Sequence, residues 1–313
     1  MRERFCIEDT ARALVAALRL REVDPRSDGL ARGYLRAIAG LRDAEGRFRF
    51  GYVRTDGMME RLAVGDQLGR LLWGLGHASA HGVDGPMRGQ ATALFRDALA
   101  AFAPAKAGPM ELSYALQGLC AYAGAHPEDA GARAVLRQAA DRLAARIPAD
   151  GDWVWPGERV TYDSGRLPLA LLLSAEALDE VRYRDLGLRV LRFLERANFP
   201  DGTGPMRVIG NAGWWVRGRE PAQADQQPVD ASGLVEAYAA AWRATRDERW
   251  RRQAERAARW FLGSNEVGLA PYEVATGACH DAIGRRAMNA NCGAEATVSA
   301  LIAVDEVTSL SRR

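Results

Sequence analysis

The sequence predicts an all-α fold made of helix hairpins that close into a ring, with an inner and an outer layer of helices. Ala, Leu and Arg dominate the composition while β-branched residues are sparse, which favours helix throughout. Apolar residues recur with helical spacing along almost the whole chain. Strongly apolar helices alternate with charged ones, so one helix of each pair is expected to be buried on both sides and the other to face water.

The periodic segments follow one another as pairs, separated by breaker stretches such as residues 24–29. The first helix of a pair is rich in Gly, Ala and Leu, whereas the second is rich in Arg and acidic residues, most clearly over residues 246–262. The buried helices begin roughly 45 to 65 residues apart, a period that indicates repeated hairpins. In order, the expected helices cover residues 7–20, 30–41, 68–75, 94–102, 112–119, 135–143, 167–178, 186–194, 231–242, 250–261 and 293–307.

The connections between these helices are strongly unequal, which favours a closed ring over an open solenoid with regular linkers. Links within a pair are short, and links to the next buried helix are mostly long and rich in Trp, Gly, Asn and Asp. We therefore expect the long loops to emerge together, at the N-termini of the inner helices. Unpaired N–H groups there favour carboxylates and hydroxyls, so this end is the predicted site. The expected fold is a single domain over residues 1–313 with about 11–12 helices.

The bulk composition is that of an ordinary globular protein and argues against several functions. Of the 313 residues, 48% are hydrophobic and 26% charged. The 42 basic and 40 acidic residues nearly cancel and no Lys/Arg block stands out, so nucleic acid is not an expected partner. The N-terminal segment has no small-residue cleavage site, and no apolar run reaches the ~18 residues that span a bilayer. A cytoplasmic protein with no membrane span is expected.

Five loops bring acids, amides and aromatic rings to the predicted end. Aromatic plates beside carboxylates suit the binding and cleavage of a sugar chain, and two adjacent tryptophans in a Gly-rich loop indicate a flat, exposed platform. The candidates are Asp66 and Arg70; Glu111 and Tyr114; Trp153, Trp155, Glu158, Tyr162, Asp163 and Arg166; Trp214, Trp215, Asp225, Gln226, Gln227 and Asp230; and His280, Asp281, Asn289, Asn291 and Glu295.

Each carboxylate also has a purely structural interpretation. Asp66, Asp163 and Asp230 stand where N-caps and first-turn acids are common. Asp66 and Arg70 are also spaced as an i,i+4 ion pair. The functional interpretation therefore depends on the convergence of the five loops rather than on any one acid.

Metal and thiol chemistry have weaker support. The four cysteines are scattered and fit no disulfide framework. His77 and His81 lie four residues apart on one helix without a third ligand. Cys279, His280 and Cys292 offer three zinc ligands but no clear spacing motif, and Cys292 as a nucleophile lacks a convincing base. We expect neither a metal nor another cofactor.

Four segments carry a resemblance to a known class: VGDQLGRLLWGLG, TYDSGRLPLALLLSAEAL, ADQQPVDASGLVEAYAAAW and NANCGAEATVSALIA. They are similar to the recurring blocks of bacterial toroids of the six-hairpin glycosidase class, which are often fused to or encoded beside glycosyltransferases in polysaccharide loci. The resemblance covers residues 28–308 and implies an (α/α)6 fold and a carbohydrate ligand. It leaves the reaction open, because the class includes hydrolases, lyases, epimerases and phosphorylases.

The leading hypothesis is a glycoside hydrolase acting on a bacterial oligo- or polysaccharide. Such cleavage needs one carboxylic acid to protonate the leaving oxygen and a second carboxylate to activate water or attack the sugar. We expect Asp163 and Glu295 to form this pair, with Asp225 or Asp230 in reserve. The substrate would be held by Asp66, Arg70, Trp153, Trp155, Tyr162, Arg166, Trp214, Trp215, Gln226, Gln227 and Asn291.

Two other functions stay open at this point. A non-catalytic glycan-binding or scaffolding domain that partners a glycosyltransferase would keep the tryptophans and would not need paired acids. A polysaccharide lyase would need a base such as His280 or Tyr162, and a uronic acid in its substrate.

Overall fold

The computed structural model describes residues 6–43, 45–48, 52–53, 59–60, 65–202 and 204–312. Within these ranges the chain is helical apart from two pairs of two-residue strands and the connecting loops. Most of the aromatic, Gly-rich loop around residues 44–64 lies outside them. No described helix is long and apolar enough to cross a membrane. Contacts divide the chain into two compact units, Met1–Leu143 and Ala144–Arg313, and each is described by itself.

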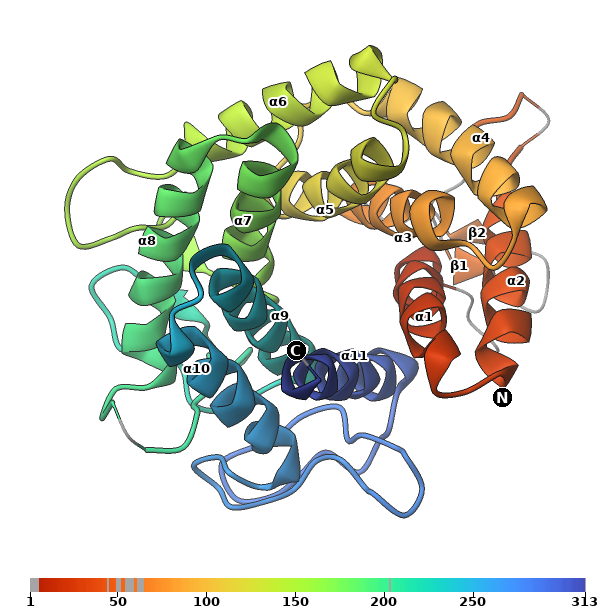
Figure 1. Cartoon of the computed structure of the whole chain (residues 1–313). Helices are drawn as coiled ribbons and strands as arrows, with labels where there is room; N and C mark the ends of the chain where they lie inside the picture. The colour runs from red at the N-terminus through yellow and green to blue at the C-terminus, as the bar shows by residue number, and fades with distance from the viewer. Residues whose placement is uncertain are drawn as a thin grey trace. The chain divides into compact units, whose positions relative to one another are not determined.

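Unit 1 consists of helices that follow one another as hairpins, with the odd-numbered helices packed together (Figure 1). Helix α3 packs against α1, α4 and α5. Strands β1 and β2 form a small antiparallel pair in the connection between α2 and α3. In chain order the elements are α1 (Ile7–Arg19), η1 (Leu20–Glu22), α2 (Arg26–Ala39), β1 (Tyr52–Val53), β2 (Met59–Glu60), α3 (Gln67–His81), α4 (Gly85–Ala101), α5 (Pro109–Ala125) and α6 (Ala130–Ala144).

Glycines allow α3 and α5 to approach closely. A Cβ atom built on Gly76 would lie 2.1 Å from the carbonyl oxygen of Gly118, and one built on Gly118 would lie 2.1 Å from that of Leu72. A Cβ atom on Gly69 would lie 2.3 Å from the carbonyl oxygen of Glu111. Larger residues at these positions would push the helices apart, so the Gly content of the apolar helices has a packing function.

Unit 2 repeats the alternation of buried and half-exposed helices. Helix α9 is buried over most of its length and packs against α7, α10 and α11, while α8 and α10 cover one side of this group (Figure 1). Strands β3 and β4 join two loops as an antiparallel pair. The elements are β3 (Arg159–Val160), α7 (Arg166–Leu178), α8 (Val181–Asn198), β4 (Trp215–Val216), α9 (Pro228–Thr245), α10 (Glu248–Arg259), η2 (Trp260–Leu262) and α11 (Ala294–Ser311).

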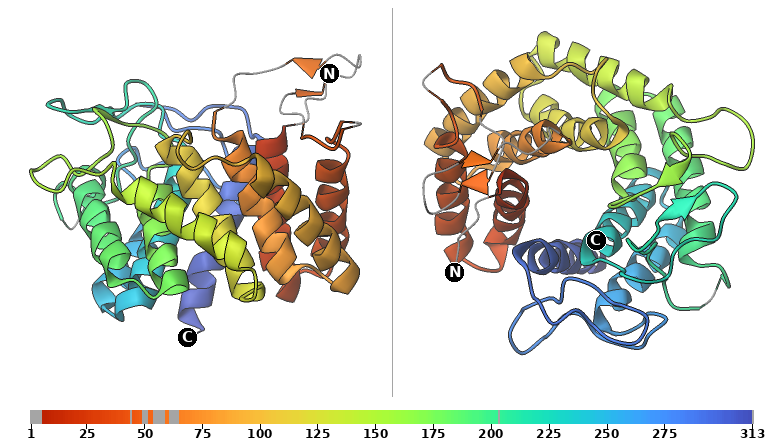
Figure 2. Two further views of the ribbon diagram at one scale, coloured as in Figure 1. Left: turned by 90° about the horizontal axis from the view of Figure 1, so that it is seen from above. Right: turned by 180° about the vertical axis from the view of Figure 1, so that it is seen from behind.

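The long connections of unit 2 lie at one end of its helices, as the sequence predicted. Residues 145–165, 199–227 and 263–293 lead into α7, α9 and α11 respectively, and they gather where these three helices begin (Figure 2). A close approach fixes this end, because a Cβ atom on Gly165 would lie 2.2 Å from the carbonyl carbon of Gly233. Three loops from distant parts of the sequence therefore share a rim.

Candidate functional site

The start of α7 holds a buried ion-pair network. Asp163 precedes the helix with φ of 49°, a left-handed backbone that Asp tolerates better than most residues. Its Oδ2 atom lies 3.1 Å from Nε of Arg166, the first residue of α7. The Arg166 guanidinium also pairs with Glu236 of α9. Asp163 has 0% and Arg166 1% of its surface exposed, so this network links α7 to α9 inside the protein.

Asp230, in the first turn of α9, joins the same network. Its Oδ1 atom accepts a hydrogen bond from the backbone N–H of Asp163 at 2.6 Å. Burial raises the pKa of the Asp230 carboxyl well above the ordinary value, and the nearby charge of Asp163 raises it further. Glu295 adds a smaller contribution of the same sign. This environment favours the protonated form of the Asp230 carboxyl group.

Glu295 is the accessible member of the acid cluster. It stands in the first turn of α11 and is half-buried, whereas Asp163 and Asp230 are buried. The structure thus brings together Asp163, Asp230 and Glu295, which the sequence placed at the starts of three helices. Asp225 lies two residues before the N-cap of α9 and is half-buried. Glu236 was missed, because nothing in its apolar helix marks it as the partner of Arg166.

Backbone strain is concentrated in the same loops. Within the described residues, five non-Gly residues have positive φ, and three of them are candidates predicted from the sequence: Asp163, Trp214 at 60° and Asp225 at 66°. The other two, Asp179 and Arg246, end helices α7 and α9, where left-handed residues are usual. Left-handed residues in loops are costly and are found preferentially at functional sites, which supports a special role for this end of unit 2.

The four tryptophans that the sequence assigned to sugar stacking differ in exposure: Trp214 and Trp215 are half-buried, and the other two are buried. Trp153 and Trp155 are 8% and 4% exposed. The ring of Trp215 stacks on Phe193 of α8 at 4.6 Å between centroids, and Trp153 meets both rings edge-on. The expectation that Trp153 and Trp155 stack on sugar faces is therefore contradicted by their burial. The rings of Trp153 and Trp215 therefore help to anchor their two loops to α8.

One aromatic pair at this end keeps partial exposure. Trp214 and Tyr162 are both half-buried, with ring centroids 6.4 Å apart. Tyr162 immediately precedes Asp163 in the sequence. These two rings are the better candidates for stacking on a ligand.

The amide side chains that the sequence assigned to substrate binding differ in burial. Gln226 is buried, and its Oε1 atom accepts hydrogen bonds from the Val208 backbone and the Trp260 indole, both at 3.1 Å. The prediction that Gln226 presents its amide to a ligand is therefore wrong, since the side chain joins three segments inside unit 2. Gln227 is half-buried at the N-cap of α9, and Asn291 is exposed and donates to Asp281.

Unit 1 carries its own acid–arginine cluster, at the starts of α3 and α5. Nε of Arg70 lies 2.9 Å from Oδ2 of Asp66, which confirms the predicted i,i+4 pair. The Arg70 guanidinium lies over the Tyr114 ring, 4.2 Å from its centroid. Burial raises the pKa of the half-buried Glu111, and the Asp66 charge adds to this. A ligand-binding role of Asp66 and Arg70 stays a prediction.

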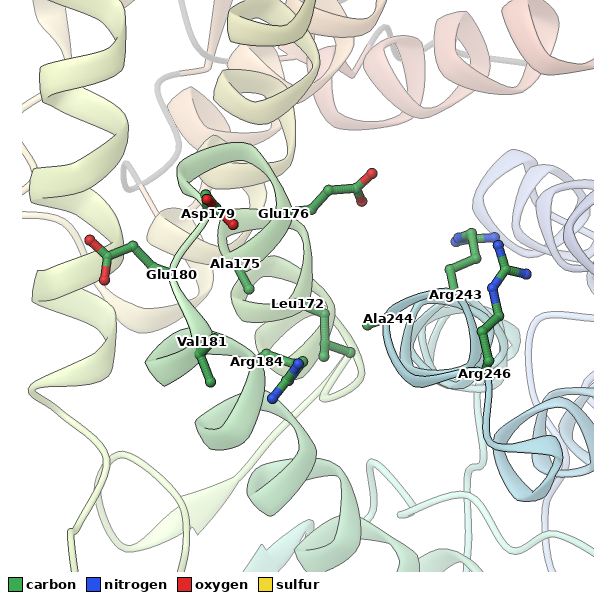
Figure 3. Close-up of a pocket in the computed structure, with 10 residues that line it drawn as sticks. All are labelled: Leu172, Ala175, Glu176, Asp179, Glu180, Val181, Arg184, Arg243, Ala244 and Arg246. Carbon is green, nitrogen blue, oxygen red and sulfur yellow. The ribbon is translucent and has the colours of Figure 1, made fainter.

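The opposite end of α7 and α9 contains a cavity of about 380 Å³ (Figure 3). Charged side chains of both signs line it, among them Glu176, Arg184 and Arg243. None of the residues predicted from the sequence contributes to its wall. The two ends of this helix pair are therefore chemically different, with buried acids where the helices begin and an open, mixed-charge cavity where they end.

The fold belongs to the (α/α)6 toroid class, as predicted. The chain matches solved structures of this class over 98% of its length. Because the sequence identity to them is low, the match establishes the fold alone. Neither a protein-family model nor a curated protein sequence matches it.

Three of these solved structures are named as enzymes of sugars. A D-mannose isomerase superposes with a TM-score of 0.74 at 11% identity, covering 98% of this chain and 88% of that one. A GH76 α-mannanase from Bacteroides thetaiotaomicron gives 0.70 at 9% identity, covering 98% and 87%. A cellobiose 2-epimerase from Spirochaeta thermophila gives 0.68 at 12% identity, also covering 98% and 87%.

Proposed function

We propose that the protein is a carbohydrate-active enzyme, and specifically a glycoside hydrolase acting on a bacterial oligo- or polysaccharide. The observation that carries this proposal is the acid cluster of unit 2, where carboxyl groups from three helix starts have different environments. Asp230 is buried with a raised pKa, while Glu295 is half-buried in the first turn of α11. Two carboxyl groups in different environments are the usual basis of acid/base assignments.

In this proposal Asp230 is the general acid and Glu295 the second carboxylate. The proton of Asp230 passes to the glycosidic oxygen as the bond to the anomeric carbon breaks, while Glu295 either deprotonates the attacking water or attacks the sugar itself. Asp163 has a positioning role, because its N–H holds Asp230 and its carboxylate is paired with Arg166. This differs from the sequence-based expectation, in which Asp163 was one of the reacting pair.

The half-exposed pair of Trp214 and Tyr162 would bind the sugar beside these acids. Aromatic faces stack on the apolar faces of sugar rings, and partial exposure leaves such a face available. Because Asp230 is only 2% exposed, productive binding must open a path between the loops to its carboxyl group. The left-handed residues Trp214 and Asp225 lie in one of the loops at this end.

The test is product formation from a panel of mannans and β-linked oligosaccharides, measured as new reducing ends and by chromatography of the products. Asp230→Asn and Glu295→Gln are each expected to lower turnover by at least about 100-fold, the scale of general acid–base catalysis. Asp305→Asn, on the far part of α11, is the matched control and should leave turnover unchanged. If every variant released reducing ends at the wild-type rate, the acid cluster would not be the catalytic site.

The same experiment separates the alternatives. Epimerised products without new reducing ends would identify an epimerase, the activity named for the similar structure from Spirochaeta thermophila. An unsaturated product absorbing in the ultraviolet would identify a lyase. Sugar binding that Trp214→Ala weakens, with no product at all, would identify a glycan-binding domain, and co-purification with a glycosyltransferase would support the predicted partnership.

A further inference from the structure

The loop that leads into α11 gathers three side chains able to bind a metal ion. Glu273, His280 and Cys292 each place one ligand atom within 4.8 Å of the other two. The sequence indicated Cys279 as the companion of His280, but Cys279 is buried, and Glu273 takes its place. Glu273 was missed because it is seven residues from His280 and reaches it across a turn.

Backbone hydrogen bonds hold these residues in place. The Glu273 N–H donates to the Ala278 carbonyl at 2.8 Å, and the His280 N–H donates to the Pro271 carbonyl at 2.9 Å. This hairpin sets Glu273 beside His280. Cys292 is held in place through its two neighbours in the sequence. Asn291 and Gly293 both donate hydrogen bonds to the Asp281 carboxylate.

The hydrogen bonds of His280 define which ring nitrogen is available. Nδ1 lies 2.7 Å from the backbone carbonyl oxygen of Asn289, which can only accept, so Nδ1 carries a hydrogen. The other ring nitrogen, Nε2, faces Oε1 of Glu273 at 3.1 Å. A ligating histidine usually donates its other N–H to a carbonyl or carboxylate in this way.

The same bond argues against a thiol nucleophile activated by His280. Sγ of Cys292 lies 3.6 Å from Nδ1, but Nδ1 already donates its hydrogen to Asn289 and cannot also accept the thiol proton. A metal ion has no such conflict, because it would bind through Nε2, with Cys292 turning toward that side of the ring. Cys292 is exposed.

We propose that Glu273, His280 and Cys292 form a binding site for a divalent transition-metal ion, with Zn²⁺ as the expected occupant. A thiolate, an imidazole and a carboxylate are together the donor set that Zn²⁺ accepts. The Glu273 side chain is 44% exposed, which leaves a coordination position open to water or to a ligand. On binding, the Cys292 thiol loses its proton to solvent and its sulfur coordinates the ion.

The experiment is titration of the chelator-treated full-length protein with Zn²⁺ by calorimetry, and with Co²⁺ by absorption spectroscopy. We expect one ion per chain and a thiolate-to-Co²⁺ charge-transfer band with tetrahedral ligand-field bands. Cys292→Ser should abolish the charge-transfer band and weaken Zn²⁺ binding by at least about 10-fold, and Glu273→Gln should weaken binding while the band persists. Cys279→Ala is the matched control and should change neither.

Two results would overturn the proposal. One is the absence of stoichiometric Zn²⁺ binding by the wild-type protein at micromolar concentrations. The other is a charge-transfer band that survives in Cys292→Ser and disappears in Cys279→Ala, which would assign the ion to the buried cysteine instead. Circular dichroism of each variant shows that it is folded, and none of these measurements depends on glycosidase activity.

Discussion

Helices α3 and α5 of unit 1 and helices α7 and α9 of unit 2 begin in the same way and differ in what surrounds their ion pairs. In both, an Asp just before the helix pairs with an Arg in its first turn: Asp66 with Arg70 at 2.9 Å, and Asp163 with Arg166 at 3.1 Å. In both, a glycine permits close approach of the neighbouring helix. The shared arrangement shows that the acid–arginine pair belongs to the architecture and does not by itself identify a catalytic site.

The difference lies in the number and burial of the acids. In unit 2 the Arg166 guanidinium serves two buried acids, Asp163 and Glu236, and Asp230 lies against Asp163 with its pKa raised. In unit 1 the neighbouring acid, Glu111, is half-buried. Excess negative charge in a buried place is costly unless one group keeps its proton. The unit 2 cluster therefore favours a protonated Asp230, which the proposed role as general acid requires.

The largest expected difference between the clusters follows from removing the arginine. Arg166→Met should lower the free energy of unfolding by about 3–5 kcal/mol, because two buried acids lose their shared cation. Arg70→Met should cost less, about 1–3 kcal/mol, because Asp66 keeps 8% exposure and can be partly hydrated after the pair is broken. Urea unfolding of both variants measures the difference. Equal losses would mean that the two clusters are energetically equivalent and would remove the basis of the comparison.

Replacing a glycine by alanine where two helices approach closely should have the next largest effect on the free energy of unfolding. A Cβ atom on Gly233 would lie 2.2 Å from Oδ1 of Asp163, and one on Gly69 would lie 2.3 Å from the Glu111 carbonyl oxygen. Each substitution should cost about 1–3 kcal/mol through overpacking. Only Gly233→Ala is expected to lower turnover as well, because it displaces an acid of the proposed site. Gly89→Ala, with open space around it in α4, is the control and should stabilise the protein by about 0.5–1 kcal/mol.

The pH dependence of stability tests the raised pKa of Asp230. In the unfolded chain Asp230 ionises near 3.8, whereas in the folded protein its pKa lies well above that value. Stability from this group is therefore fully present below about pH 3.8 and is lost as the pH rises toward the raised folded pKa. The loss is about 1.4 kcal/mol for each pH unit that separates the folded pKa from the unfolded one. Asp230→Asn removes this loss.

Thermal melts of the wild type and Asp230→Asn across this pH range make the measurement. The melting temperature of Asp230→Asn should increase relative to that of the wild type as the pH rises. Glu111→Gln is the comparison in unit 1, and its effect should have the same sign but a smaller size, because Glu111 is only half-buried. Parallel curves for wild type and Asp230→Asn would show that Asp230 is ionised in the folded protein.

The fold was predictable because apolar periodicity is local information. Each helix shows its buried face within about a dozen residues, and the unequal loops indicated which end of unit 2 they share. The convergence of Asp163, Asp230 and Glu295 followed from that topology. Their division into a buried pair and one accessible acid could not be predicted, because burial depends on loops that lie far away in the sequence.

The errors at the site have the same origin. Trp155 and Gln226 stand in Gly-rich loops of polar composition, which predicted exposure, yet both are buried by contacts with distant segments. Glu236 and Glu273 were missed because their partners, Arg166 and His280, are identified only by the folded backbone. A long loop that packs against helices behaves as part of the core, and its composition does not reveal this.

The smallest expected effect on stability concerns the aromatic rings, and it separates a ligand-binding ring from a packing ring. Trp214→Ala should change the free energy of unfolding by less than about 1 kcal/mol, because Trp214 is half-buried and its ring lies as far as 6.4 Å from that of Tyr162. Trp155→Ala, its matched control, removes a buried ring and should cost about 3–5 kcal/mol. Calorimetry with oligosaccharides should then show weaker binding for Trp214→Ala. If Trp214→Ala bound sugars as the wild type does, the stacking surface would have to be sought elsewhere on the rim of unit 2, while the acid cluster would keep its proposed role.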